Sequence, residues 1–187
     1  MITRITTSFF FFILLASAAF AQADSANVEL LGKQQQLADY RQAFWNNLPQ
    51  PVGWLNDFAN VYTTSEKSAL DSLMAELNKD KLAQFAIVTL DSICVSADKF
   101  DSLNLRIASA WGVGEKGKNN GILIGINTGH RKIRIDNGDG IVKVISDMET
   151  KEIINNFFTP AFKRGEYYEG TLAGLLELNK LLKARMK

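Results

Sequence analysis

Apolar residues repeat along the chain with two spacings, and the helical spacing is marked by two capping signals. Thr63 and Glu66 form a capping box ahead of an apolar face with a period near 3.6, which predicts a helix. Ser146 and Glu149 form a second capping box. The helix that it opens is expected to end before Pro160, because proline disfavours helical geometry in the residue before it.

Between these helices lie short apolar runs that are typical of buried strands. The expected strands are residues 85–90, 122–127 and 132–136, and two further helices are expected at 98–111 and about 172–182. The turn Thr128–Arg131 joins the last two strands as a hairpin. Helices interleaved with few strands, including one hairpin, predict an α/β sandwich whose sheet is mixed rather than wholly parallel.

The start of the chain has the pattern of a signal peptide. Arg4 precedes an apolar run at 8–20 that is short for a membrane span, and Ala19-Phe20-Ala21 supplies a small-x-small cleavage pattern. This predicts a signal peptide over residues 1–21, cleaved after Ala21 or after Ala23. We therefore expect an exported protein, periplasmic or secreted.

The remainder of the chain predicts one domain. Residues 22–51 indicate a lead-in segment, partly helical or flexible, and the compact domain is expected over 52–187. No later segment is apolar enough to cross a bilayer, so the mature chain is expected to be soluble, with no transmembrane segment.

Charge and cysteine content narrow the class of partner. The chain has 21 Lys plus Arg and 20 Asp plus Glu, and removal of the signal peptide takes away only Arg4, which leaves 20 of each. This balance gives no bulk attraction to nucleic acid or anionic lipid. Cys94, the single cysteine, cannot form an internal disulfide, and a small buried residue is favoured over pairing between chains.

The stretch 111–121, WGVGEKGKNNG, matches two phosphate-loop patterns, G-x-G-x-x-G and G-x-x-x-x-G-K. Both patterns need a strand before the loop and a helix after it, so that amide groups at a helix N-terminus meet phosphate. Here the expected order is a helix, then the loop, then a strand, and Asn119 stands where a hydroxyl residue belongs. This order favours a glycine-rich helix exit over a nucleotide loop.

Candidate catalytic and metal-binding groups are few. His130 is the only histidine and is expected in an exposed turn, so no Ser-His-Asp or Cys-His arrangement is indicated. One Cys and one His leave only carboxylates, which suit Ca²⁺, Mg²⁺ or Mn²⁺ rather than structural zinc, and carboxylates and amides do cluster at the expected element ends. Such groups lie beside glycines or at helix starts, where each alone is typical of a cap or turn: Asp57, Asn119, Asn120, Asp136, Asp139 and Asp147.

Five segments in order resemble the TPM-domain family, which is named for a thylakoid-lumen phosphatase, a photosystem II repair protein and a modulator of acetylcholine receptors. The resemblance covers about residues 52–182. The segments are PVGWLNDFANVYT, QFAIVTLDSI, ASAWGVGEKGKNNGILIGIN, RKIRIDNGDGIVKVISD and TPAFKRGEYYEGTLAGL.

The resemblance implies an exported domain built as a three-layer α/β/α sandwich with a central mixed sheet of about four strands. It also implies a divalent-cation site, Ca²⁺ or else Mg²⁺, in an acidic cleft. Family aspartates correspond to Asp57 in LNDFA and Asp147 in ISD, and the family's D-N-G motif corresponds to Asn119, Asn120 and Gly121. Asn119 replaces the aspartate of that motif. The lost charge should weaken a hard-cation site, although an amide oxygen can still coordinate.

Two functions follow from these expectations. The first is an accessory or binding module that uses a Ca²⁺-stabilised cleft of Asp57, Asn119, Asn120 and Asp147 to recognise a protein or small ligand outside the cytoplasm. The alternative is a metal-assisted acid phosphatase for phosphomonoesters, with Arg131 or Arg164 holding phosphate and Asp147 as base or nucleophile. The missing histidine chemistry and the substituted Asn119 favour the module.

Overall fold

The computed structural model describes residues 6–186, and of residues 6–25 it gives the backbone alone. The chain divides into two compact units, Met1–Ala43 and Phe44–Lys187. A long helix, α1 (Thr6–Asn46), contains the whole of the first unit that is described. No helix within residues 6–186 is both long and apolar enough to cross a membrane. Residues 1–5 of the expected signal peptide lie outside the described residues.

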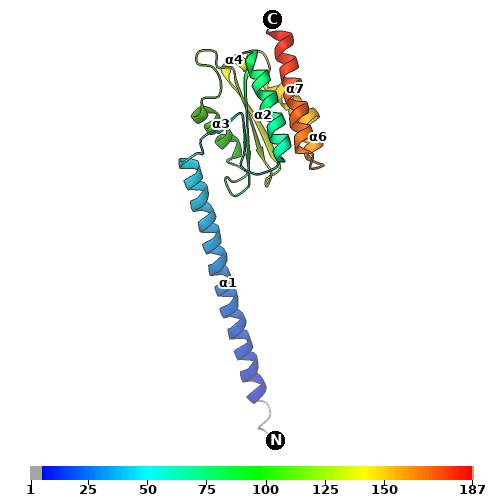
Figure 1. Cartoon of the computed structure of the whole chain (residues 1–187). Coiled ribbons are helices and arrows are strands. Elements are labelled where there is room, and N and C mark those ends of the chain that lie inside the picture. Colours follow the sequence, from blue (N-terminus) through cyan, green and yellow to red (C-terminus); the bar gives the residue numbers. More distant parts are fainter. Residues whose placement is uncertain (1–5, 187) are drawn as a thin grey trace. The chain divides into compact units, whose positions relative to one another are not determined.

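The second unit is built on a four-stranded mixed sheet in the order β1-β2-β3-β4 (Figure 1). The strands are β1 (Leu55–Asp57), β2 (Gln84–Leu90), β3 (Gly121–Asn127) and β4 (Lys132–Asn137). The first three strands run parallel, and β4 returns antiparallel to β3 through the expected hairpin. The carboxyl ends of β1, β2 and β3 therefore lie on the same side of the sheet as the hairpin turn, at one end of the strands.

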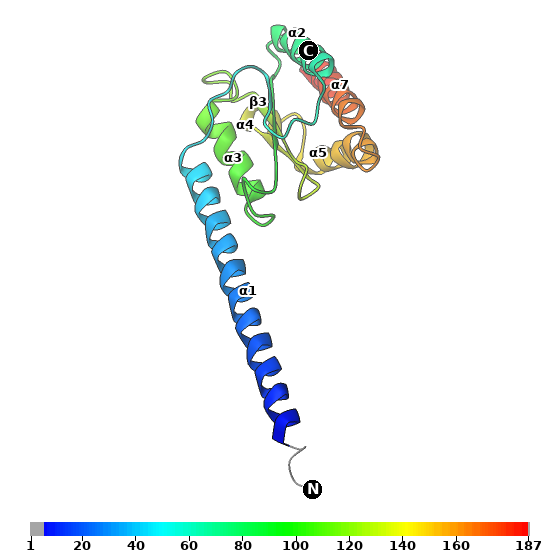
Figure 2. The same ribbon diagram turned by 60° about the horizontal axis from the view of Figure 1, so that its bottom comes forward.

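The helices cover both faces of this sheet. They are α2 (Thr64–Lys79), α3 (Phe100–Trp111), α4 (Asp139–Val142), α5 (Asp147–Ile153), the π-helical turn η1 (Ile154–Phe158), α6 (Thr159–Phe162) and α7 (Tyr167–Arg185). Figure 2 shows α2, α5 and α7 on one face and α3 on the other.

Each face has its own apolar core, which explains why the central strands are apolar along their whole length. Phe85, Ile87 and Ile124 pack toward α2 and α7. Val88 and Leu123 point the other way and pack beneath α3. Strands buried on both faces have near-continuous apolar sequences, as β2 and β3 do. The expected three-layer α/β/α sandwich is confirmed.

The two capping boxes are present as expected. The Thr63 side chain accepts the Glu66 amide, the Glu66 carboxylate accepts the Thr63 amide, and the same reciprocal pair joins Ser146 and Glu149. Each box satisfies amide groups that have no partner inside the helix, so each fixes the residue at which its helix begins.

The expectation that the helix opened by Ser146 ends before Pro160 is wrong. The helix widens into η1, where the amide of Thr159 donates to the carbonyl of Ile154. Pro160 is the second residue of the next turn, α6. Proline is tolerated in the first turn of a helix, where its lack of an N–H does not cost a helical hydrogen bond. The π-helical turn thus lets the chain continue past the proline.

Candidate functional site

One cavity of the second unit lies at the carboxyl ends of the parallel strands, where the hairpin turn meets the α6–α7 corner. It has a volume of about 510 Å³ and takes its floor from the end of β3 and the start of β4. Arg131, Lys132, Lys163 and Arg164 are among its lining residues, and none of the lining residues is acidic. Phe162 supplies an aromatic side chain to the same lining. We call this the basic cavity.

The hairpin turn positions two of these cations. The side chain of Asn127 accepts the amide of His130 at 2.9 Å, and the amide of Arg131 donates to the carbonyl of Thr128 at 3.2 Å. These bonds hold Arg131 with φ of 52°, a conformation that non-glycine residues rarely adopt. The turn is therefore fixed, and with it the direction in which Arg131 and Lys132 leave the backbone.

The α6–α7 corner positions the other two cations. Gly165 takes φ of 83°, where glycine avoids the strain of a side chain, and its amide donates to the carbonyl of Phe162 at 3.0 Å. Lys163 and Arg164 thus lie at the carboxyl end of α6, where the helix dipole favours positive charge.

The four cations are not equally available to a ligand. Arg164 donates to Glu166 and to the carbonyl of Pro160, and Lys132 donates to the carbonyl of Ala97 at 2.6 Å. The Arg164 guanidinium holds the pKa of the Glu166 carboxyl below its usual range.

The side chains of Arg131 and Lys163, in contrast, have no hydrogen bond or ion pair with any residue that the structure describes. These two side chains are the charges that an anion entering the basic cavity would meet unpaired.

The loop 112–120 lies at the amino ends of β2 and β3, opposite the basic cavity, and is confirmed as a helix exit. Gly112 ends α3 in the left-handed conformation, its amide donates to Ala108 and Ser109, and β3 follows the loop. A helix C-terminus presents carbonyl groups, which repel phosphate.

Asn120 organises this loop from inside. Its side-chain oxygen accepts the amide of Glu115 at 2.8 Å, and its side-chain nitrogen donates to the carbonyl of Lys81 at 3.2 Å. Asn120 is 3% exposed. Its amide group is therefore used within the protein.

Asn119 has a backbone role in the same loop. It is exposed and has φ of 49°, a region that asparagine tolerates better than most residues. Its carbonyl accepts the amide of Gly140 at 3.0 Å, and a Cβ on Gly138 would lie 2.2 Å from the same oxygen. The glycines of DNGDG thus allow this run to pack against Asn119.

Asp57 lies at the carboxyl end of β1, and both of its carboxylate oxygens have partners within the protein. One carboxylate oxygen accepts the Thr89 hydroxyl at 2.6 Å and the Val61 amide at 3.0 Å. The second oxygen accepts the Tyr62 amide at 3.3 Å and the Lys67 ammonium at 2.9 Å. The side chain is only 2% exposed. Burial opposes its ionisation, but these donors outweigh burial and hold the pKa of Asp57 below its usual range.

The four residues expected to hold a cation do not lie together. Asp57 is paired with Thr89 near the end of β2, whereas the carbonyl of Asn120 accepts the amide of Gln84 at the start of that strand. Asp147 is exposed in the first turn of α5. Within residues that the structure describes, no group of three or more His, Cys, Asp and Glu side chains could hold a metal ion. Cation binding stays a prediction. The arrangement does not support a single ion bound by all four residues.

The arginines considered as phosphate ligands, in contrast, are brought together, since Arg131 and Arg164 line one cavity. Sequence reasoning missed Lys132 and Lys163. Two dipeptides, RK in the hairpin and KR at the helix end, were the available signal. Asp147 lies instead beside a different cavity, so the expected phosphatase residues are not assembled at one point.

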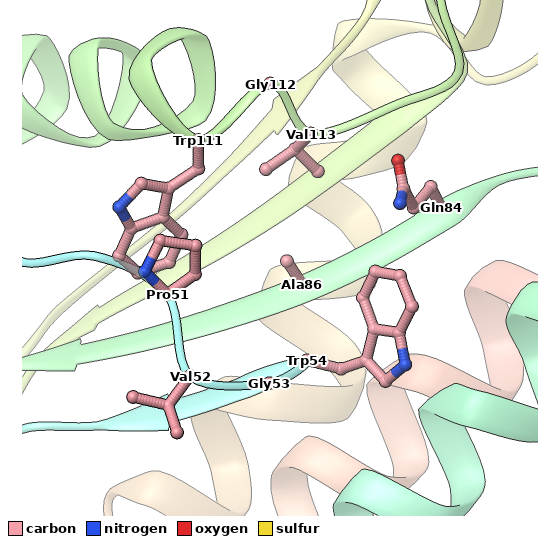
Figure 3. Close-up of a pocket in the computed structure, with 9 residues that line it drawn as sticks. All are labelled: Pro51, Val52, Gly53, Trp54, Gln84, Ala86, Trp111, Gly112 and Val113. Carbon is pink, nitrogen blue, oxygen red and sulfur yellow. The ribbon is translucent and has the colours of Figure 1, made fainter.

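A smaller apolar cavity of about 250 Å³ lies at the amino end of β2 (Figure 3). Trp54, Ala86 and Trp111 line it, and no charged residue does. The Trp111 indole donates to the carbonyl of Pro49 at 2.8 Å, which holds that wall in place. Gln84 is the one polar side chain among its lining residues, and its oxygen already accepts the amide of Gly114, so this cavity is a weaker candidate than the basic cavity.

Comparison with known proteins identifies the family. The family model described as the TPM domain matches residues 55–181. The chain therefore belongs to the TPM-domain family, as its motifs predicted. No curated protein matches this chain.

Solved structures support the same fold. The N-terminal domain of a protein from P. gingivalis is 27% identical, with a TM-score of 0.63 over 70% of this chain and 82% of that one. The BA42 protein from Bizionia argentinensis is 18% identical, with a TM-score of 0.59 over 68% of this chain and 86% of that one. The N-terminal domain of the cg2496 protein from Corynebacterium glutamicum is 14% identical, with a TM-score of 0.50 over 73% and 83%. The last two likenesses concern the fold alone.

Proposed function

We propose that this TPM domain is an exported binding module that takes an anionic ligand, of the phosphate or carboxylate type, into the basic cavity. The observation that carries the proposal is that Arg131 and Lys163 line one cavity and have no partner among the described residues. Guanidinium and ammonium groups form short, charge-assisted hydrogen bonds with such anions.

The position of the cavity supports a ligand site. In open α/β sheets, ligands bind beyond the carboxyl ends of the parallel strands, where loops converge. The basic cavity lies at these carboxyl ends, and its volume of about 510 Å³ is in the range of small-molecule sites. The net charge of the chain is close to neutral, so attraction of anions depends on this local group of cations.

Binding is favoured over hydrolysis by the same lining. A metal-assisted phosphatase needs carboxylates to hold the metal or to act as a base, and none of the residues that line the cavity is acidic. The phosphatase remains a second candidate because Arg131 and Arg164 do share the cavity. Its test is phosphomonoester turnover with Ca²⁺ or Mg²⁺ present, which should disappear in Arg131→Gln if this cavity is the active site.

The binding proposal is tested by titrating inorganic phosphate into isotope-labelled protein. We expect shifts at the amides of Arg131, Lys163 and Gly165, and a loss of affinity of about tenfold in Lys163→Gln, since a charge-assisted hydrogen bond contributes about 1.5 kcal/mol. Lys116→Gln is the matched control, because Lys116 is exposed in the glycine loop and does not line the cavity. Equal losses in both variants, or no shifts at the cavity, would reject the proposal.

A further inference from the structure

The outer edge of β4 presents backbone groups that have no partner. The amide of Gly138 donates to the carbonyl of Gly121, and this bond sets the alternation of the antiparallel β3–β4 ladder. By that alternation Arg134 bonds to β3, whereas the N–H and C=O groups of Ile133 and Ile135 point away from the sheet. No residue that the structure describes accepts or donates a hydrogen bond there.

On the opposite side of the sheet, the part of β2 that extends beyond β1 is closed. β1 is short, so the first half of β2 has no neighbouring strand, and Phe85 would be left with a free N–H and C=O. The side chain of Asn78 takes both, since its oxygen accepts the Phe85 amide at 2.8 Å and its nitrogen donates to the Phe85 carbonyl at 3.3 Å. The next free donor, the Ile87 amide, bonds to the carbonyl of Trp54 at 2.8 Å. A side chain thus pairs the uncovered part of β2, whereas the backbone groups of Ile133 and Ile135 have no such partner among the described residues.

A groove runs along the open edge. A cavity of about 420 Å³ lies between β4 and the helical run α5–η1, which packs on the same face of the sheet as α7 (Figure 2). Asp147, Thr150 and Ile154 line it at spacings of three and four residues, so one side of this helical run forms the wall. Ile133 lines both this groove and the basic cavity, and the two are therefore neighbours along β4.

We propose that the groove takes an extended peptide as a fifth strand, antiparallel to β4, with the peptide's C-terminal carboxylate in the basic cavity. Main-chain hydrogen bonds to Ile133 and Ile135 supply the pairing, and alternate side chains of the peptide face the α5–η1 wall, as in other cases of strand addition. β4 runs from Lys132, which lines the basic cavity, toward Asn137, so a peptide that ends at the cavity must run the opposite way. The charged end of this inference rests on the proposed anion binding, whereas the strand pairing does not.

Charge complementarity selects this occupant. The basic cavity at one end of the groove holds the unpaired cations Arg131 and Lys163, which suit a carboxylate. The groove itself carries acids and bases together, Asp101 and Asp147 with Arg134 and Lys151, and so has no single sign of charge to select a polyanion along its length. A peptide with one charged terminus and an uncharged extended body fits both parts.

The test begins with random heptapeptides displayed with free C-termini and selected on the full chain. A selected peptide should lose about tenfold or more in affinity when alternate amides are N-methylated, because methylation removes ladder hydrogen bonds. Its binding should also slow hydrogen exchange at the amides of Ile133 and Ile135. Failure to select any binder, or a binder insensitive to N-methylation, would overturn the inference.

Variants of the protein localise the peptide. Asn155→Trp, which fills the groove, should abolish binding, and Asn156→Trp, at the exposed neighbouring residue that does not line the groove, should leave it unchanged. Ile133→Pro should also abolish binding, because it removes an N–H that faces outward and so spares the ladder to β3. Equal effects of the two tryptophans would place the peptide elsewhere.

Modification of the peptide terminus separates this inference from the proposed function. C-terminal amidation and Lys163→Gln should each weaken the peptide about tenfold or more. Binding that is lost on amidation but insensitive to N-methylation would overturn strand addition and leave anion binding standing. Binding that needs the ladder but ignores amidation would overturn the placement of the carboxylate. Formation of a dimer through β4, seen as a doubled mass with loss of peptide binding in the dimer, would assign the edge to a second copy and overturn the peptide.

Discussion

Asn104 of α3 lies directly against Gly125 of β3, so closely that a Cβ on Gly125 would come within 1.9 Å of the Asn104 side-chain oxygen. The other end of the same amide donates to Asp136 at 2.8 Å, and Asp136 in turn accepts from Arg134 at 2.8 Å. Asn104 is fully buried, and its oxygen has no hydrogen-bond partner among the described residues. This polar contact sets the position of α3 on the sheet, and Gly125 is the residue that makes room for it.

Gly125→Ala is therefore expected to destabilise the domain by about 2 kcal/mol, as in other overpacked cores. Asn104→Ala removes the atom with which the new methyl group collides, so the double variant should lose less stability than the sum of the two single variants. Urea unfolding of all four proteins measures this coupling, expected at about 1 kcal/mol or more. Strict additivity would show that the two residues are not in contact.

The aspartates at 57 and 147 should behave very differently when each is replaced by asparagine. Asp57 is buried and accepts four hydrogen bonds or ion-pair contacts, and an amide there would place a donor against donors. We expect Asp57→Asn to cost about 3 kcal/mol or more, whereas Asp147→Asn should cost at most about 1 kcal/mol, because Asp147 is exposed in the first helical turn. Urea midpoints compare the two, and similar losses would contradict the structural role of Asp57.

Sequence patterns predicted much of this fold because its signals are local. The capping boxes at 63–66 and 146–149, the buried strands β2 and β3, and the hairpin all depend on neighbouring residues. β1 was not expected, because three residues are too few to show a period and the strand exists through its pairing with β2. The passage of Pro160 depends on the π-helical turn, which no propensity predicts.

The candidate site was harder to predict because it depends on whether each residue lies at the amino or the carboxyl ends of the parallel strands. Asp57 and Asn119 look alike in sequence, as polar residues at element ends, yet Asp57 lies at the carboxyl ends of the parallel strands and Asn119 at their amino ends. Conversely, Arg131 and Lys163 are far apart in sequence and meet only because the α6–α7 corner lies beside the hairpin turn. Convergence of this kind is set by topology rather than by local pattern.

A divalent cation that binds Asp57 must displace Lys67, whose ammonium lies 2.9 Å from the carboxylate. We therefore expect Lys67→Met to raise Ca²⁺ affinity at Asp57 by about tenfold, since it removes a competing charge from the ligand group. Amide shifts during a Ca²⁺ titration of both proteins measure the change. An affinity that is the same in both would exclude Asp57 as a ligand.

Stability should fall on acidification through the pairing of Glu149 with Arg185. The Arg185 guanidinium, at 2.6 Å, and the Ser146 amide hold the pKa of Glu149 at about 2 in the folded protein, below its ordinary value of 4.5. The unfolded chain therefore takes up a proton first, so this contribution is present above about pH 4.5 and is lost as the pH falls toward about 2. Urea midpoints at several pH values should show a shallower loss in Glu149→Gln than in the parent. Glu152→Gln, at an exposed residue of the same helix, should follow the parent, and a parallel decline in all three would refute this origin.

Asn119→Asp tests the other candidate cation ligand and does so independently of Asp57. The substitution restores the aspartate of the family's D-N-G motif and adds a charge next to Asn120, so Ca²⁺ affinity at this loop should rise by about tenfold if the loop coordinates the ion. Asn119→Gly is the matched control, because glycine accepts the φ of 49° and supplies no side-chain oxygen. Because Asn119 and Asp57 lie at opposite ends of the parallel strands, the effects of Asn119→Asp and Lys67→Met should appear at different amides and add without coupling. Coupled effects would mean that Asn119 and Asp57 bind the same ion. The two residues would then have to move toward each other when the ion binds.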